Sequence, residues 1–543
     1  MRERIDSLLN DRARPTLSKK LKNIGVVSFL TVVSRVLGLA RDTLSADIFG
    51  ASVLNSAFLT AFRLPNLFRR LLGEGSLTAA FLPTLQHELH DRGRPGAFVL
   101  LNQVSSWLAI VTGGLAVGAM LLLDHSRAIA PGLADRWYLI ADLSVLLFPY
   151  LAFVCLAAAL NATLNVFEHF TEPALSPIWL NLSMIATLGG AGLHFAKTPL
   201  GEMHWLCAGV LIGGSLQLAV PAAVLVKLGW KPRVDFSLSP RVLEIGRLMA
   251  PGFFGSAIYQ VNLYVSSLLA YSLNDFAGTL IFYAGRLMEL PIGVFAIAIS
   301  TVVYPLIARH AVQKNYSGMA DDYRKGLRLI LVVNVPAAVG LGLLSQPIVG
   351  LLFRHGKFTP ADAHMMAPLL MLYVVGLPFF SIVNLTVRAF YSLKDTSSPV
   401  KVAAVDFCVN LGLSLLLMRW LGVFGLVLAS TAAIVVQTVL LQRSLARKLV
   451  ELKFAPLWPS VAKVLLAALG MGVLVWAARL LVTGMALGVR TTEALEVLAL
   501  IPAGAVVYGV LLWLLRIEGR EELAALVQKK LPWFANREFP GKS

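Results

Sequence analysis

The sequence predicts an all-α integral membrane protein with about fourteen transmembrane helices. Of its 543 residues 57% are hydrophobic and only 14% are charged, whereas soluble chains carry roughly 25% charge. The mean hydropathy is +0.74. Long apolar runs recur along the chain, with basic residues clustered between them. A chain this apolar cannot cover a water-facing surface with polar groups, so lipid is its expected solvent.

The predicted spans follow from these apolar runs. A helix needs about 20 mostly apolar residues to cross the hydrocarbon core of a bilayer. The run at 53–73 is the least apolar of those that qualify. The predicted spans are 24–44, 53–73, 98–123, 138–161, 173–194, 205–226, 243–270, 279–304, 328–353, 364–390, 400–418, 422–442, 459–483 and 494–515.

The distribution of Lys and Arg predicts the orientation. With the N-terminus inside, the outer connections carry about seven Lys and Arg and the inner segments roughly 30. Both termini are therefore expected in the cytoplasm, which requires an even number of spans. Residues 1–22 are polar and basic and show no cleavage-site pattern, which predicts a cytoplasmic lead-in and not a signal peptide. Residues 308–328 and 518–530 predict amphipathic helices on the membrane surface.

Several other readings of the composition are excluded. The net charge of +17 arises from clusters between apolar runs, so it indicates topology and not a nucleic-acid partner. The three cysteines lie far apart in apolar surroundings, which predicts buried small hydrophobes and neither a disulfide nor a zinc site. These are Cys155, Cys207 and Cys408. Four histidines in or near connections are expected on solvated surface, namely His87, His90, His355 and His364.

Charged residues inside the spans are the functional signal. A charge at mid-bilayer costs about 2.5–3.5 kcal/mol on insertion scales, so these side chains must face a hydrated cavity or partners. Arg35, Gly38 and Asp42 share one helix face, and Arg286 and Glu289 are three residues apart. The arginine fork suits phosphate, so we expect a basic cavity for an anion. The candidate binding residues are Arg35, Arg41, Asp42, Arg63, Arg69, Arg70, Arg286 and Glu289.

Some of these charged residues could instead have a purely structural role. Arg69 and Arg70 near the inner end of their span could snorkel to the interface. Glu74 could simply pair with Arg70, and Arg41–Asp42 could be a structural pair between helices. Two further cations near the ends of span 459–483 are expected to snorkel, namely Lys463 and Arg479.

Three classes of protein fit a charged interior: an anion transporter, an intramembrane enzyme and a channel. The sequence holds no HExxH or GxSxG motif, which disfavours an enzyme. The interior charges are mixed in sign and come from a few helices, which disfavours a channel lined by a ring of one charge. A transporter is therefore the preferred class.

The charged helices also carry specific motifs. The first is SRVLGLARD at 34–42, continued by FGA at 49–51 and by AFRLPNLFRR at 61–70 with EG at 74–75. The others are RLMELPIGV at 286–294, GKFT at 356–359 and AFYSLKDTSSPV at 389–400. Together they resemble the MurJ/MviN family of the MOP transporter superfamily, and the resemblance runs from about residue 20 to 515.

This resemblance implies a fold and a function. It implies two pseudo-symmetric six-helix lobes at 1–235 and 236–455, then two C-terminal helices and a tail at 456–543, with a groove for a lipid tail. It implies a flippase that moves lipid II, the undecaprenyl-pyrophosphate-linked disaccharide-pentapeptide, across the bacterial inner membrane for peptidoglycan synthesis. Membrane lipids and cell-wall synthesis enzymes are the further expected partners. By the same resemblance Arg35, Arg41, Arg69 and Arg286 are cavity arginines, with Asp42 and Glu289 as charged partners.

The sequence departs from the family pattern at two acids. Ser56 stands where the family usually has Asp, and Gly285 stands where it has the Asp before Arg286. Some relatives resemble one another in a sodium site built with acids. The nearest positions here are Ser266, Asn410 and Ser414, and all three residues are neutral. We therefore expect no cofactor and no sodium coupling, and we expect the membrane potential to reset a positively charged empty cavity.

Two alternative functions stay open at this stage. One is a related exporter of another polyprenyl-linked saccharide or amphiphile. The other is a scaffold that holds cell-wall enzymes without transport.

Overall fold

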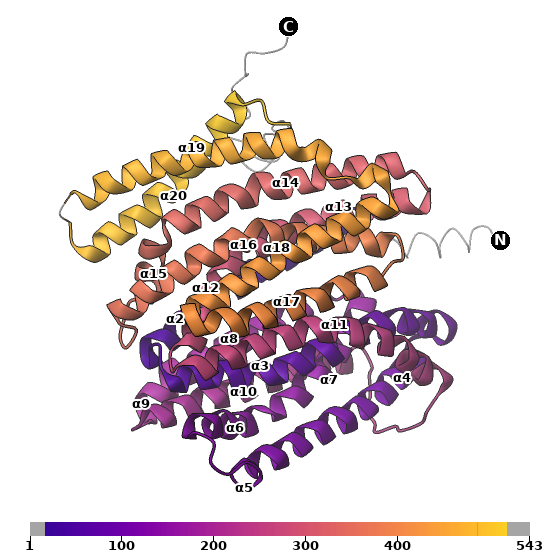
Figure 1. The fold of residues 1–543 in the computed structure, drawn as a ribbon. Helices are drawn as coiled ribbons and strands as arrows, with labels where there is room; N and C mark the ends of the chain where they lie inside the picture. The colour runs from indigo at the N-terminus through magenta and orange to yellow at the C-terminus, as the bar shows by residue number, and fades with distance from the viewer. Residues whose placement is uncertain (1–16, 486, 519–543) are drawn as a thin grey trace. The chain divides into compact units, whose positions relative to one another are not determined.

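The computed structural model describes residues 17–485 and 487–518, and every regular element in these ranges is a helix. The chain divides into two compact units, Met1–Tyr264 and Val265–Ser543. The predicted all-α fold class is confirmed. In each unit the long helices run side by side, as Figure 1 shows.

The first unit contains the helices up to most of α11. They are α2 (Leu17–Phe49), α3 (Val53–Phe68), η1 (Arg69–Gly75), α4 (Ser76–Asp124), α5 (Ser126–Ile129), α6 (Asp135–Leu147), α7 (Pro149–Val166), α8 (Thr171–Ala186), η2 (Thr187–Gly192), α9 (Leu193–Phe195), α10 (Pro199–Lys227) and α11 (Pro240–Leu273). Gly50 at φ 63° ends α2, and Ser52 caps α3 by accepting from the Asn55 backbone N–H at 3.3 Å.

The second unit contains the remaining helices. They are α12 (Ala277–Pro291), η3 (Ile292–Ala296), α13 (Ile297–Val312), α14 (Tyr316–Leu343), α15 (Ser345–Phe353), α16 (Pro360–Ser392), α17 (Ser397–Leu421), α18 (Val423–Lys448), η4 (Val450–Leu452), η5 (Ala455–Leu457), α19 (Trp458–Thr483) and α20 (Val489–Leu514). A capping box starts α16, in which Thr359 and Asp362 exchange hydrogen bonds.

Eleven helices in the described residues are long and apolar enough to cross a membrane. Each overlaps one of the predicted spans. The other three predicted spans, 24–44, 53–73 and 243–270, lie on α2, on α3 with η1, and on α11. All three are helical, and α2 together with α3 and η1 carries six of the eight candidate binding residues. The count of fourteen stays a prediction.

Two predicted features differ in the structure. Residues 308–328 form no separate surface helix, because α13 continues to Val312 and α14 already begins at Tyr316, where Asn315 caps it. Cys155 and Cys207 are buried as expected, but Cys408 is exposed on α17, whose outer face packs against little of the protein. The predicted tail helix at 518–530 lies almost wholly outside the described residues.

Short π-helical segments interrupt three of the predicted spans. They are η1 after Pro65, η2 after α8, and η3 directly after Pro291. A π-helical turn adds a residue to the turn and shifts the helix face that follows, and such turns are frequent at functional sites. Two of the three, η1 and η3, directly adjoin candidate binding residues.

The segment between α10 and α11 is tied down along α4. Trp230 donates through Nε1 to Asn102 Oδ1 at 2.8 Å, and Asn102 donates to the Lys231 carbonyl at 3.1 Å. Further along, the Asp235 N–H donates to Ser106 Oγ at 2.9 Å. The segment is therefore a fixed strap, whose backbone groups satisfy buried polar side chains of α4.

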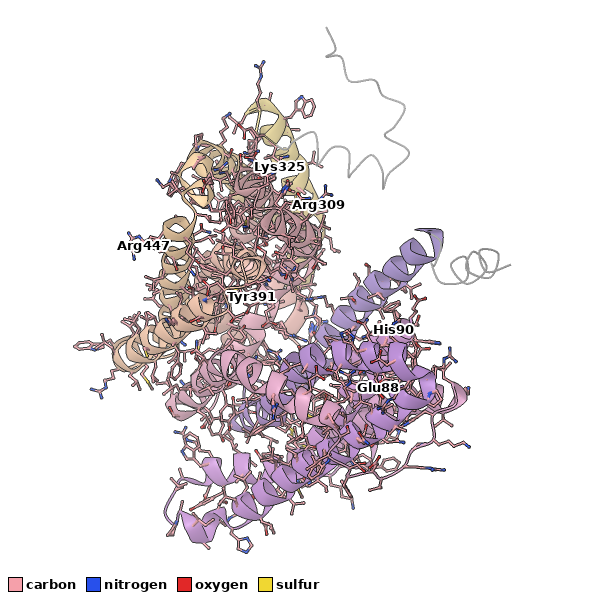
Figure 2. The ribbon with its side chains drawn as sticks, turned by 90° about the vertical axis from the view of Figure 1, so that its right-hand side faces the viewer. Glu88, His90, Arg309, Lys325, Tyr391 and Arg447 are labelled. Atoms are coloured by element: carbon pink, nitrogen blue, oxygen red, sulfur yellow. The ribbon has the colours of Figure 1, made fainter. Side chains whose placement is uncertain are left out.

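Several cations gather at one end of the second unit. Figure 2 looks onto the end where α13 and α18 stop and α14 starts, and Arg309, Lys325 and Arg447 lie there. This end is rich in cations, and Lys448 pairs with Asp395 in the connection between α16 and α17. In the first unit the same view labels Glu88 and His90 on α4, of which Glu88 is buried and His90 exposed.

Candidate functional site

The charged pair on α2 is buried. Arg41 is 9% exposed and Asp42 is 2% exposed. Nε and Nη2 of Arg41 donate to Asp42 Oδ1 at 3.0 and 2.5 Å. Nη1 donates to Asn181 Oδ1 on α8 at 3.1 Å. The pair thus lies within one helix and is fixed to a second helix by a neutral amide, which differs from a salt bridge between helices.

The predicted polar face of α2 is present. Gly38 and Asp42 are buried and Arg35, six residues before Arg41, is half-buried. Gly38 and Asp42 therefore lie within the protein, and Arg35 is partly accessible. Arg35 has polar or electrostatic partners in the structure, as expected for a cation in a membrane helix.

The arginines of the second predicted span have separate environments. Arg63 on α3 donates to the Leu263 carbonyl of α11 at 3.3 Å, within the first unit. Arg69 opens η1 and donates through Nε to Asn66 Oδ1 at 3.0 Å. Arg70 is exposed.

The charged pair on α12 is accessible. Arg286 Nη1 lies 3.4 Å from Glu289 Oε2, and the two side chains are 38% and 60% exposed. The spacing of three residues predicted this pair correctly. Pro291 and the π-helical η3 follow within one turn. A Cβ built on Gly285 would meet no atom within 4 Å, so the acid that the family usually has beside this arginine would fit there.

The structure therefore brings together Arg41 with Asp42 in the first unit, and Arg286 with Glu289 in the second. That both pairs line one cavity stays a prediction. Chemically, the first is a compensated charge held by protein, and the second is a cation whose weak partner can be exchanged.

Sequence reasoning missed several polar partners. Asn181 was not singled out, although an amide in an apolar span is a signal of the same kind as the arginines. Arg388 on α16 donates to Thr301 Oγ1 on α13 at 3.2 Å. Two acids at the start of α20, Glu493 and Glu496, are 8% and 2% exposed.

The prediction that Arg479 snorkels to the membrane interface is wrong, because Arg479 pairs with one of these two acids. Its Nε donates to Glu496 at 3.1 Å and its Nη1 donates to the Leu343 carbonyl at 2.8 Å, so it joins α19 to α20 and α14 and does not snorkel. Arg354 similarly donates to Glu493 at 2.8 Å. The C-terminal helices α19 and α20 are thereby fixed to the other helices of the second unit. Tyr508 adds a hydrogen bond to the Val332 carbonyl at 2.8 Å.

The three neutral residues expected near a sodium position do meet. Asn410 donates through Nδ2 to Ser266 Oγ at 3.0 Å, and Ser414 lies 3.5 Å from Asn410 Oδ1. The amide thus presents its NH2 group to Ser266 and its oxygen to Ser414, and the cluster carries no charged side chain among these three residues. Among the described residues no group of three or more His, Cys, Asp or Glu side chains could hold a metal ion.

The comparison with known proteins decides the family. The family model described as "Lipid II flippase MurJ" matches residues 45–491. The chain belongs to the MurJ family. Proteins of this family are transporters and not catalytic enzymes, and the chain is accordingly a multi-pass membrane transporter of a bacterial family.

Relatives of MurJ type cover most of the chain. A "Probable lipid II flippase MurJ" of Vibrio cholerae is 30% identical over 527 residues, which are 94% of this chain and 99% of that protein. One of Haemophilus influenzae is 33% identical over 470 residues, 82% and 90% of the two chains. The "Lipid II flippase MurJ" of Burkholderia cenocepacia is 32% identical over 392 residues, 69% and 74% of the two chains.

Solved structures agree on the fold. A MurJ structure described as lipid II flippase in an inward closed conformation has a TM-score of 0.72 at 23% identity, covering 93% of this chain and 99% of that one. An inward-facing multidrug resistance transporter of the MATE family in the MOP superfamily has a TM-score of 0.62 at 15% identity, covering 78% and 98%. The MOP-type fold expected from the motifs is confirmed.

Proposed function

We propose that this MurJ-family transporter moves lipid II from the inner to the outer leaflet of the bacterial inner membrane. The observation that carries the proposal is the accessible Arg286 on a membrane-crossing helix of a chain whose relatives are named lipid II flippases. Both termini lie in the cytoplasm in this proposal, as the excess of Lys and Arg on the inner connections favours. Lipid II and the surrounding lipids are its partners, and cell-wall synthesis enzymes are further candidates.

The binding step follows from the geometry of α12. Arg286 is more than a third exposed and its contact to Glu289 is long, so the pair contributes little stability in water. A pyrophosphate offers the guanidinium two parallel charge-assisted hydrogen bonds, which are about twice as strong as neutral ones. The head group therefore displaces Glu289 at low cost.

The buried pair on α2 has a different role in this proposal. Arg41 is fixed by its hydrogen bonds to Asp42 and Asn181, so its guanidinium is held in one orientation and meets an anion without a large rearrangement. Because Asp42 compensates its charge, the positive field comes from Arg35, Arg63, Arg69 and Arg70. A positive field in a low-dielectric surround concentrates an anionic head group.

Transport then proceeds by alternating access around a site near the membrane midplane. The head group neutralises the arginines, the two lobes that the family resemblance implies switch to outward access, and the tail stays in lipid beside α19 and α20. An empty, positive site is returned inward by the membrane potential, worth roughly 2.3 kcal/mol per charge per 100 mV. No coupling sodium ion is part of this proposal.

Complementation tests the proposal. In a strain depleted of its own lipid II flippase, the wild type should restore growth and Arg286→Ala should not, at equal membrane levels. Arg127→Ala is the matched control, because Arg127 is exposed on α5, between two predicted spans, and pairs with Asp142 of α6. A well-inserted wild type that fails to rescue, in a host that accepts another MurJ relative, would overturn lipid II transport.

A further inference from the structure

We infer that Asn181 on α8 is a positioning residue for Arg41, and this rests on the proposed function. Asn181 is 6% exposed. Its Oδ1 accepts from Arg41 Nη1 at 3.1 Å, and its Nδ2 donates to the Ser34 carbonyl of α2 at 3.1 Å. One amide thus holds both the guanidinium of Arg41 and the backbone of α2, the helix that carries it, at points two turns apart.

The second hydrogen bond fixes the direction of the amide. An asparagine can present either its oxygen or its NH2 group to a neighbour. Because the Ser34 carbonyl can only accept, Nδ2 must face it, and Oδ1 must face Arg41. A reversed amide would oppose two pairs of like groups, so the observed orientation is enforced by α2 itself.

A neutral acceptor suits this position better than an acid. Asp42 already supplies one negative charge to Arg41, through Nε and Nη2. A second carboxylate at position 181 would make the group net negative and repel an anionic head group. An apolar residue would leave Nη1 with only the weak acceptor Met184 Sδ, at 3.8 Å. The neutral amide therefore holds the guanidinium without adding a second negative charge.

The proposal assigns Asn181 a measurable effect on binding. With the orientation of Arg41 lost, or with a second negative charge beside it, the lipid head group binds more weakly, while the later steps are unchanged. We expect Asn181→Leu and Asn181→Asp to raise the half-saturating concentration of lipid II about tenfold, equivalent to about 1.4 kcal/mol. The maximal transport rate should stay within about twofold, and Asn181→Ser, which keeps a smaller acceptor, should fall between.

Gln217 on α10 offers a matched control. It is 4% exposed, donates to the Ser176 carbonyl of α8 at 2.8 Å and accepts from the Tyr150 hydroxyl at 3.3 Å. It is thus a buried amide that joins a helix to α8, as Asn181 does, but both its partners are uncharged. Gln217→Leu should lower thermal stability as Asn181→Leu does and leave the half-saturating concentration unchanged.

The experiment is transport of purified lipid II by the full chain in proteoliposomes. If the wild type does not move lipid II, the proposed function fails and Asn181 is not the cause. If the wild type transports and the Asn181 variants change stability only, as the Gln217 variant does, the positioning role is overturned. A double mutant completes the test, since in an Arg41→Gln background Asn181→Leu should have no further effect on half-saturation. An additive effect there would contradict the inference.

Discussion

Two arginine–acid pairs in the membrane helices differ in one property. The Arg41 and Asp42 side chains on α2 are 11% and 3% exposed, whereas those of Arg286 and Glu289 on α12 are 38% and 60% exposed. Both pairs are local in sequence. The difference teaches that charge in a span does not by itself define a binding group, because burial decides whether the partner can be exchanged.

The largest expected effect comes from removing the acid from each pair, which tests whether the two pairs differ in stability. Asp42→Asn leaves Arg41 buried without a counter-ion, and loss of one member of a buried pair costs about 3–5 kcal/mol. Glu289→Gln should change the free energy of unfolding by less than about 1 kcal/mol, because that side chain is largely exposed. Thermal unfolding of both variants in detergent measures this. Equal losses would show that the two pairs do not differ as described.

A third ion pair tests whether burial of a pair by itself affects substrate binding. Glu496 is buried against Arg479, like Asp42 against Arg41, but it lies between α19 and α20. We expect Glu496→Gln to destabilise the chain by about 2–3 kcal/mol through the unsatisfied Arg479. The affinity for lipid II should not change, as binding assays at a temperature below unfolding would reveal. A weakened affinity would show that burial alone affects binding, and would remove the distinction between the α2 pair and this one.

The binding role of the accessible Arg286–Glu289 pair is tested by restoring the acid that the family usually has at position 285. Gly285→Asp meets open space and replaces glycine in a helix, so stability should rise by about 0.3–0.5 kcal/mol. The added carboxylate beside Arg286 should weaken binding of the anionic head group about threefold, roughly 0.7 kcal/mol. Gly285→Asn is the uncharged control. Tighter binding in the Asp variant would contradict an anion clamp at Arg286.

A further expected effect lies outside the spans, at Asp395. Burial alone would raise the pKa of this carboxyl, but hydrogen bonds from Lys448 and Ser398 outweigh it and lower the pKa to about 2. Since the folded pKa lies below the unfolded value of about 3.9, the stabilisation is present above pH 4 and is lost as the pH falls toward 2. Because Lys448 is 45% exposed, the contribution is on the order of 1 kcal/mol.

Unfolding midpoints between pH 5 and 2 test this effect. Asp395→Asn should lower stability at pH 5 and flatten this part of the profile relative to the wild type. An unchanged profile would show that Asp395 is not a stabilising carboxylate.

Much of the fold could be predicted from the sequence, since a span is a local property of about 20 residues. The spacing of Arg286 and Glu289 is equally local, and their contact was predicted correctly. The partners of Arg41 and Arg479 could not be, because Asn181 lies 140 residues from Arg41 and depends on how α8 packs on α2. The separate helix at 308–328 was predicted wrongly, since polar helix ends extend beyond a membrane without any change of secondary structure.

Direct binding of lipid II to the purified chain tests the central claim that Arg286 is the exchangeable anion-binding group. Affinities of wild type, Arg286→Gln and Arg127→Gln would be compared at two salt concentrations. The account predicts a loss of at least tenfold for Arg286→Gln with a weaker salt dependence, and wild-type affinity for Arg127→Gln. Unchanged affinity and salt dependence in Arg286→Gln would contradict it.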